Sequence, residues 1–282
     1  MRRPHGNEEP RQGIGSEELV ARGDLFREAG DLIEAEHCYR LALGLGDESD
    51  PAAVDGRIAA LGAAAAPVVR RWAQSLDAAG RYAEALRLTE PVLAVLDEAE
   101  RLEAARIRLV RGKLLMELGR HEAAAAEARA GVQQLERRAE TETVVEEGFL
   151  SNLLGALAFR QGRVPEASHW FHRGLDVFKR LGRVREMALG YNNLGQVAKR
   201  QGNWQQALEA YQVARNLAST EGATRDRIGA LLNLAYIKLH QGRLQSAQSD
   251  FRQAQGEADR AGDRLRQARA TIGWAQVARA RG

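Results

Sequence analysis

Small and bulky apolar residues recur along the chain at fixed distances from a series of glycines. Each of these glycines is followed five residues later by an alanine. The pairs are Gly30/Ala35, Gly80/Ala85, Gly119/Ala124, Gly162/Ala167, Gly202/Ala207 and Gly242/Ala247, and Gly282 stands in the same register. The last three intervals between these glycines are 40 residues each. Self-similarity at a fixed period of this size predicts an array of repeated structural units.

The residues around each glycine follow the same period. Seven residues before it, the side chain is never larger than a methyl group: Gly23, Ala73, Gly112, Gly155, Gly195, Ala235 and Ala275. Nine residues after it, most repeats carry an aromatic ring: Tyr39, Phe171, Tyr211 and Phe251. Small residues that admit close packing, with a ring to fill the groove, predict two antiparallel helices in each repeat. The glycine lies at the turn, where a side chain would resist the backbone conformation.

The pattern predicts helix nearly everywhere from residue 16 onward. The expected pairs cover 16–29 and 31–45, 66–79 and 81–97, 100–118 and 120–139, 144–161 and 164–181, 184–201 and 204–220, and 224–241 and 244–261. A last helix over 264–281 has no partner. The first interval is longer than the others and contains an insertion near 47–60, whose Asp-Pro and Asp-Gly dipeptides are typical of loops and precede an added turn of helix. Residues 1–15 are predicted to be a disordered lead, and residues 16–282 a single repeat domain.

This order of small residue, turn glycine, alanine and aromatic ring resembles the tetratricopeptide repeat over about residues 16–282. The usual repeat has 34 residues and a proline that closes its second helix. Here the period is longer and that proline is missing, which is similar to the longer-helix variety found in kinesin light chain and in sensor regions of bacterial regulators. The resemblance implies an all-α, right-handed superhelical solenoid of about six helix pairs plus a final unpaired helix. It also implies a concave groove, lined by the first helix of each pair, that binds peptides or helices.

In the resembled family, the sites two, three, six, nine and ten residues before the turn glycine face the groove. Here the fourth to sixth repeats present polar residues at those sites: Asn152, Asn192, Asn193, Gln196, Lys199, Arg200, Asn233, Tyr236 and His240. The resemblance implies that such asparagines bond to the backbone of an extended peptide, while Lys or Arg side chains hold carboxylates. Asparagine is mildly unfavourable inside helices, so its recurrence indicates a use. The alternative is a solvated face or bonds between neighbouring helices.

The composition supports a helical protein and limits the classes of partner that it can bind. Prolines number only 6 and aromatic residues make up 5% of the chain, a mixture that favours helix over strand. The formal net charge is only +3 and the recurrent rings fall at core spacing, so the sequence predicts no nucleic acid partner. No apolar run suggests a signal peptide or a membrane helix. A single cysteine, Cys38, is expected to be a buried apolar residue and suits a reducing compartment. We therefore expect a soluble, cytoplasmic protein.

No residue constellation points to catalysis or to a bound cofactor. His169 and His172 are three residues apart, but no carboxylate or cysteine completes a metal site. Phosphate-binding loops, nucleophile elbows and zinc-protease motifs are all missing from the sequence. The sequence thus predicts a non-catalytic protein that needs no cofactor.

The leading hypothesis is a protein-interaction module that binds a peptide or helix in its groove, with a weak preference for acidic ligands. Two alternatives stay open. The chain could be a ligand-responsive regulatory segment of a larger signalling or transcription protein, with an effector domain beyond Gly282. It could also be a self-assembling scaffold, since the last helix is incompletely polar and would allow self-association.

Overall fold

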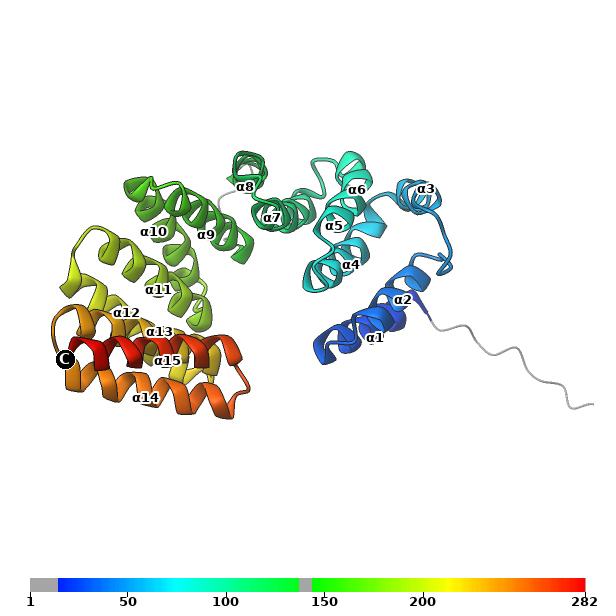
Figure 1. Cartoon of the computed structure of the whole chain (residues 1–282). Coiled ribbons are helices and arrows are strands. Elements are labelled where there is room, and N and C mark those ends of the chain that lie inside the picture. The colour runs from blue at the N-terminus through cyan, green and yellow to red at the C-terminus, as the bar shows by residue number, and fades with distance from the viewer. Residues whose placement is uncertain (1–14, 137–143, 282) are drawn as a thin grey trace, which may run out of the picture. The chain divides into compact units, whose positions relative to one another are not determined.

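The computed structural model describes residues 15–136 and 144–281, and every regular element among them is a helix (Figure 1). The all-α fold predicted from the sequence is therefore confirmed. The predicted disordered lead lies outside the described residues, except for Gly15. The chain divides into two compact units, one up to residue 124 and one from residue 125.

The first unit contains the helices that precede the repeats of regular length. They are α1 (Ser16–Ala29), α2 (Leu32–Ala42), α3 (Pro51–Leu61), a 3-10 turn (Gly62–Ala65), α4 (Ala66–Ala78), α5 (Tyr82–Leu88), α6 (Glu90–Val95) and α7 (Arg101–Glu117). The insertion near 47–60 contains helix α3 where only a loop and a turn of helix were expected. Asp50 caps this helix by accepting a hydrogen bond from the Ala53 amide at 2.8 Å. Val54 and Ile58, on the inner face of the helix, are buried.

The helix expected over 81–97 is divided into α5 and α6. Pro91 stands in the first turn of α6. Its ring has no N–H and collides with the carbonyl four residues earlier, so one continuous helix cannot pass through this point.

The apolar segment Pro51–Ala78 is long enough and apolar enough to cross a membrane, with a mean hydropathy of 1.4 in its most apolar window. The sequence pattern did not predict such a segment. Core helices meet the same criteria, and a single segment of this kind is only a weak indication of a membrane span. Here Ile58, Val69 and Trp72 pack in the hydrophobic core of the first unit.

The second unit contains most of α8 (His121–Glu136) and the helices that follow it. These are α9 (Val145–Arg160), α10 (Val164–Arg180), α11 (Val184–Arg200), α12 (Trp204–Thr220), α13 (Thr224–His240), α14 (Leu244–Arg260) and α15 (Arg264–Ala280). From α9 onward each helix packs against the next one along the chain, and the first helices α9, α11, α13 and α15 also touch in succession. Adjacent helix pairs stacked in sequence order are the arrangement that the repeat pattern predicted.

The turn glycines have the backbone conformation that the sequence predicted. Gly162 and Gly202 have φ angles of 77° and 79°, a left-handed region that favours glycine. After Gly162, the Arg163 amide donates to the Ala158 carbonyl at 2.9 Å, which closes the last turn of α9. A second series, Gly182, Gly222 and Gly262, has the same conformation at the turns between one pair and the next.

Where a repeat has a glycine at the small site and a ring on its second helix, the glycine lies directly under the ring. A Cβ atom added at Gly155 would stand 2.6 Å from the Phe171 ring, and one added at Gly195 would stand 2.6 Å from the Tyr211 ring. These separations are far below van der Waals contact. The close approach of the two helices therefore depends on the missing side chain.

Replacing Gly155 with valine should lower the free energy of unfolding by about 2 kcal/mol, because the added side chain overpacks the Phe171 ring. Urea unfolding followed by circular dichroism measures this change. Gly256→Val is the matched control, since Gly256 lies within α14 and no atom lies near its added Cβ. The control should change stability by less than about 0.5 kcal/mol. Equal losses in the two variants would show that packing under the ring is not the cause.

A buried tyrosine joins the first two helices. The Tyr39 hydroxyl donates to Asp24 Oδ1 at 2.8 Å, and Arg71 Nε donates to Asp24 Oδ2 at 2.9 Å. Tyr39 is fully buried. Burial, together with the hydrogen bond to Asp24, raises the pKa of Tyr39 to about 12.

Stability should therefore fall between about pH 10 and pH 12. In this window the unfolded chain loses the tyrosine proton while the folded protein keeps it, so rising pH favours unfolding. Tyr39→Phe removes this contribution. The difference in melting temperature between wild type and Tyr39→Phe should shrink as the pH rises through this window, and a constant difference would contradict the assignment.

Candidate functional site

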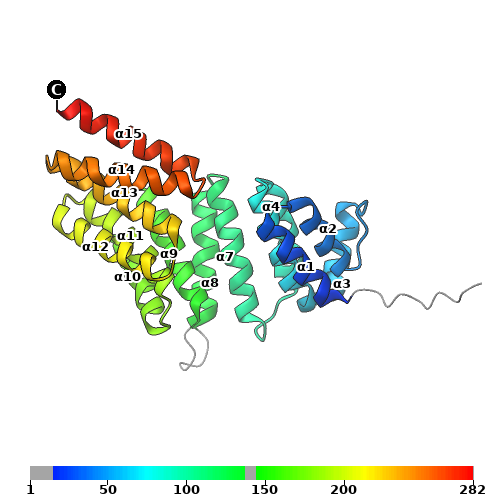
Figure 2. The ribbon, with the colours of Figure 1, turned by 90° about the horizontal axis from the view of Figure 1, so that it is seen from below.

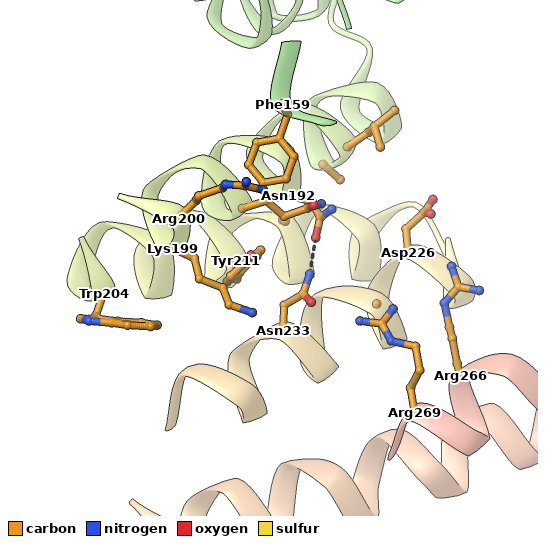
Figure 3. Close-up of a pocket in the computed structure, with 15 residues that line it drawn as sticks. Phe159, Asn192, Lys199, Arg200, Trp204, Tyr211, Asp226, Asn233, Arg266 and Arg269 are labelled. Carbon is orange, nitrogen blue, oxygen red and sulfur yellow. Dashed lines mark hydrogen bonds between the residues drawn. The ribbon is translucent and has the colours of Figure 1, made fainter. Parts of the chain in front are cut away.

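A pocket of about 600 Å³ lies in the second unit, on the side of the first helices (Figure 3). Residues from α9, α11, α13 and α15 surround it, and residues from α12 also line it. The lining residues include Phe159, Asn192, Lys199, Arg200, Trp204, Tyr211, Asp226, Asn233, Arg266 and Arg269. The stacking of successive first helices thus brings together side chains that are more than a hundred residues apart in the sequence.

Two asparagines meet across the pocket from neighbouring first helices. The Asn233 Nδ2 donates to Asn192 Oδ1 at 2.9 Å (Figure 3). Both side chains are half-buried. An amide has two donor hydrogens and an acceptor oxygen, so this bond leaves the Asn192 nitrogen and the Asn233 oxygen available. Together they offer a donor group and an acceptor, and a peptide group can bond to both.

Positive charge dominates the pocket. Four cationic side chains line it, and the only lining carboxylate is that of Asp226, whose Oδ2 lies 3.5 Å from Arg185 Nε. Arg266 is paired with Asp263 at 2.6 Å. Among the residues that the structure describes, Lys199, Arg200 and Arg269 have no carboxylate at ion-pair distance. The pocket therefore has cationic groups free to bind an anion.

Aromatic rings hold two of these cations in place. The Arg200 guanidinium lies 5.2 Å from the centre of the Phe159 ring, and Lys199 Nζ lies 5.9 Å from that of the Tyr236 ring. Both distances are within the range of cation–π attraction. At the pocket rim, Trp204 stacks on His240 with ring centres 5.2 Å apart.

The buried side chain of Tyr211 forms part of the pocket lining. Tyr211 is 1% exposed, and burial raises the pKa of its hydroxyl. The charge of Arg269 acts in the opposite direction and lowers the pKa of the same group. A charged ligand in this pocket would be less screened than one at an open surface.

The structure gathers five of the nine predicted groove residues around this pocket. They are Asn192, Gln196, Lys199, Arg200 and Asn233. Tyr236 and His240 are not among the lining residues. Each contacts one of them, Tyr236 the side chain of Lys199 and His240 the ring of Trp204. Asn193 is half-buried and does not line the pocket.

Asn152 has a different environment from the other predicted asparagines. It is only 7% exposed, and its Oδ1 lies 3.0 Å from the place where a Gly174 side chain would begin. Its amide is thus packed between α9 and α10. Neither amide atom has a hydrogen-bond partner among the described residues. This position belongs to the packing of a helix pair and not to the pocket.

Some lining residues were not singled out from the sequence. Arg266 and Arg269 lie near the start of α15, and Asp226 and Gly229 occupy the equivalent turns of α13. The sequence signal was available, because the two pairs of sites are 40 residues apart and so occupy matching positions of successive repeats, sixteen and thirteen residues before the turn glycine. The predicted inner face was therefore too short at its N-terminal end.

Cationic residues at comparable sites in the first unit are mostly paired. Arg70 Nε donates to Glu103 at 2.8 Å, and Arg71 Nε donates to Asp24 at 2.9 Å. The positive charge of these two arginines is therefore compensated. No cluster of His, Cys, Asp and Glu suited to a metal ion occurs in residues 15–136 or 144–281. Cys38 is buried, as predicted.

Two parts of the sequence match the profile of a known protein family. Residues 148–220 and residues 228–258 each match the family profile described as tetratricopeptide repeat. The protein is therefore a helical repeat protein, and its second unit carries tetratricopeptide repeats. Such repeats form a class of protein-interaction modules. No curated protein matches the sequence.

Several solved structures share the fold at low sequence identity. BtubC (BKLC) from P. vanneervenii is 18% identical with a TM-score of 0.64, over 88% of this chain and 92% of that chain. The apo form of RapI is 12% identical with a TM-score of 0.62, over 94% and 97%. A signal transduction ATPase with numerous domains and a tetratricopeptide repeat sensor, from Pyrococcus horikoshii, is 14% identical with a TM-score of 0.69, over 92% and 37%.

Replacing Asn152 with leucine should raise the free energy of unfolding by about 1 kcal/mol, because it removes a buried amide without partners and keeps the same branched shape. Asn192→Leu is the comparison, since it deletes the bond to Asn233 and should cost about 0.5–1 kcal/mol. Urea unfolding of both variants gives the two values. A loss of stability in Asn152→Leu would mean that this amide has a partner in solution.

Proposed function

We propose that this protein binds an acidic peptide segment of a partner protein in the pocket between α11, α13 and α15. The observation that carries the proposal is the coexistence of three uncompensated cations with an asparagine pair in one 600 Å³ pocket. Burying charge without a counter-charge is unfavourable, so an anionic ligand would stabilise this site. The proposed role requires no catalytic group, and we propose the cytoplasm as its place of action.

Each part of the pocket has a role toward such a ligand. The free donor of Asn192 and the free acceptor of Asn233 match one peptide group of an extended chain. Lys199 and Arg269 are placed to bind a carboxylate beside it, since charge-assisted hydrogen bonds are the stronger kind. The exposed Trp204 face offers a contact for an apolar side chain next to the acidic one.

Structures of the same fold include a complex with a bound factor and a sensor, which supports a binding role in a regulatory context. A Rap protein complexed with competence and sporulation factor shares the fold with a TM-score of 0.60, at 13% identity over 94% of this chain and 74% of that chain. In the Pyrococcus ATPase the repeats are described as a sensor. The second candidate function is accordingly a regulatory segment in which ligand binding alters an attached domain.

A peptide array gives a direct test. Each host-derived sequence is printed in two forms, one with its acidic residues intact and one with Glu and Asp replaced by Gln and Asn. Wild type should bind the acidic form about tenfold more tightly. The Lys199→Ala/Arg269→Ala variant should lose this difference, with affinities confirmed by fluorescence anisotropy.

Two control variants separate charge at the pocket from charge elsewhere. Arg180→Ala/Arg252→Ala removes two exposed cations that do not line the pocket, and it should bind like wild type. Asn152→Leu should also bind like wild type, because this residue is outside the pocket. Equal binding of acidic and neutral peptides by wild type, or an equal loss in the two double variants, would refute the proposal.

A further inference from the structure

Helix α15 exposes a face that every earlier first helix of the second unit buries. Fourteen residues before the turn glycine, Ala188 and Ile228 are buried under the second helix of their pair, whereas the equivalent Ala268 is exposed. Seven residues before it, Ala235 is fully buried and Ala275 is exposed. Figure 2 shows α15 as the outermost helix of this unit. The small residues that accept a packed helix are present, and no described helix covers them.

The exposed face is regular and apolar. Leu265, Ala268, Ile272, Ala275 and Arg279 follow one another at alternating steps of three and four residues. Leu265 is 70% exposed and Ile272 is 55% exposed. This spacing forms a continuous stripe along one side of a helix, the kind of seam that packs against another helix.

The charge of α15 excludes a symmetric partner. The helix carries four arginines and no acidic residue: Arg264, Arg266, Arg269 and Arg279. Asp263, at its N-terminal cap, compensates only Arg266. Two α15 helices packed against each other would bring these charges together, and like charges across a helix interface are destabilising. The exposed face of α15 is therefore complementary to a helix that carries acidic residues.

The chain itself has such a helix at its other end. The hairpin of α1 and α2 carries seven carboxylates against three arginines: Glu17, Glu18, Asp24, Glu28, Asp31, Glu34 and Glu36 against Arg22, Arg27 and Arg40. Asp24 and Glu36 are already paired with Arg71 and Arg81, whereas Glu18 and Glu28 are exposed on α1. On α1, the exposed residues Glu18, Ala21, Leu25 and Glu28 follow the same steps of three and four. Leu25 is 68% exposed. This stripe complements that of α15 in period, apolar centre and charge.

We propose that α15 of one copy packs against α1 of a second copy, so that the protein associates head to tail. In an antiparallel arrangement Leu25 lies against the small residues around Ile272, while Glu18 and Glu28 face the arginines toward the two ends of α15. The two contact surfaces are different, so the interface is heterologous and can propagate into a chain or close into a ring. Neither Leu25 nor Ile272 lines the peptide-binding pocket, so the two proposals can be tested separately.

Sedimentation velocity of the full chain tests the proposal, from about 1 µM to about 200 µM to span a weak to moderate affinity. Wild type should form species larger than a monomer, and added salt should weaken them because opposite charges contribute. Ile272→Asp and Leu25→Asp should each weaken association at least about tenfold. Val213→Asp and Val95→Asp, both at partly exposed valines outside the two stripes, are the matched controls and should associate like wild type. Circular dichroism confirms that each variant is folded.

Mixing the two defective variants gives the decisive result. A Leu25→Asp copy keeps its α15 intact and an Ile272→Asp copy keeps its α1 intact, so their mixture should form a dimer that cannot grow further. The proposal is overturned if wild type stays monomeric throughout this range, or if the mixture stays monomeric. It is also overturned if Ile272→Asp alone abolishes association while Leu25→Asp does not, which would point to another partner for α15.

Discussion

The contact between a ring on the second helix and a missing side chain on the first is the interaction on which this structure depends. With only a hydrogen atom at Gly155 or Gly195, the Phe171 and Tyr211 rings reach the backbone of the facing helix. The two helices of a pair are then held close, and each pair leaves an apolar face that only the next pair can cover. The inner surface of α11, α13 and α15 is a consequence of that stacking, because it sets neighbouring first helices side by side.

Charge compensation, and not the repeat itself, distinguishes the pocket from comparable surfaces. First helices of both units carry arginine and lysine on corresponding faces. In the first unit, Arg70 and Arg71 are neutralised by Glu103 and Asp24. In the second unit, Lys199 and Arg269 have no such partner among the described residues, and the buried Tyr211 side chain forms part of the pocket lining. The same architecture therefore forms a compensated surface in one part of the chain and an anion-attracting pocket in another.

The helix pairs and their turns could be predicted because they depend on local patterns that repeat. The differences between the predicted and the observed structure have causes that the repeat pattern does not contain. Pro91 interrupts a helix that periodicity alone would continue. Asn152 and Asn192 occupy equivalent sites, yet one is buried in a helix pair and the other lines the pocket, a difference that depends on neighbours which the pattern does not specify. For the same reason the sequence identified only some of the residues that line the pocket. Exposure and ion pairing are properties of the packed structure, and the repeat pattern does not specify them.

The length of the repeat explains why the pocket extends further toward the N-terminal ends of the first helices than the sequence indicated. From α10 to α15 every helix has 17 residues, and the repeat has 40 residues in place of the usual 34. Six added residues shared between two helices lengthen each by about 4.5 Å, which is most of one turn. In α13 and α15 the N-terminal turns carry Asp226, Arg266 and Arg269 on the inner face. The longer repeat thus supplies the wall of the pocket that holds the cations of α15, and a repeat of ordinary length would leave the Asn192–Asn233 pair at the edge of a shallower groove.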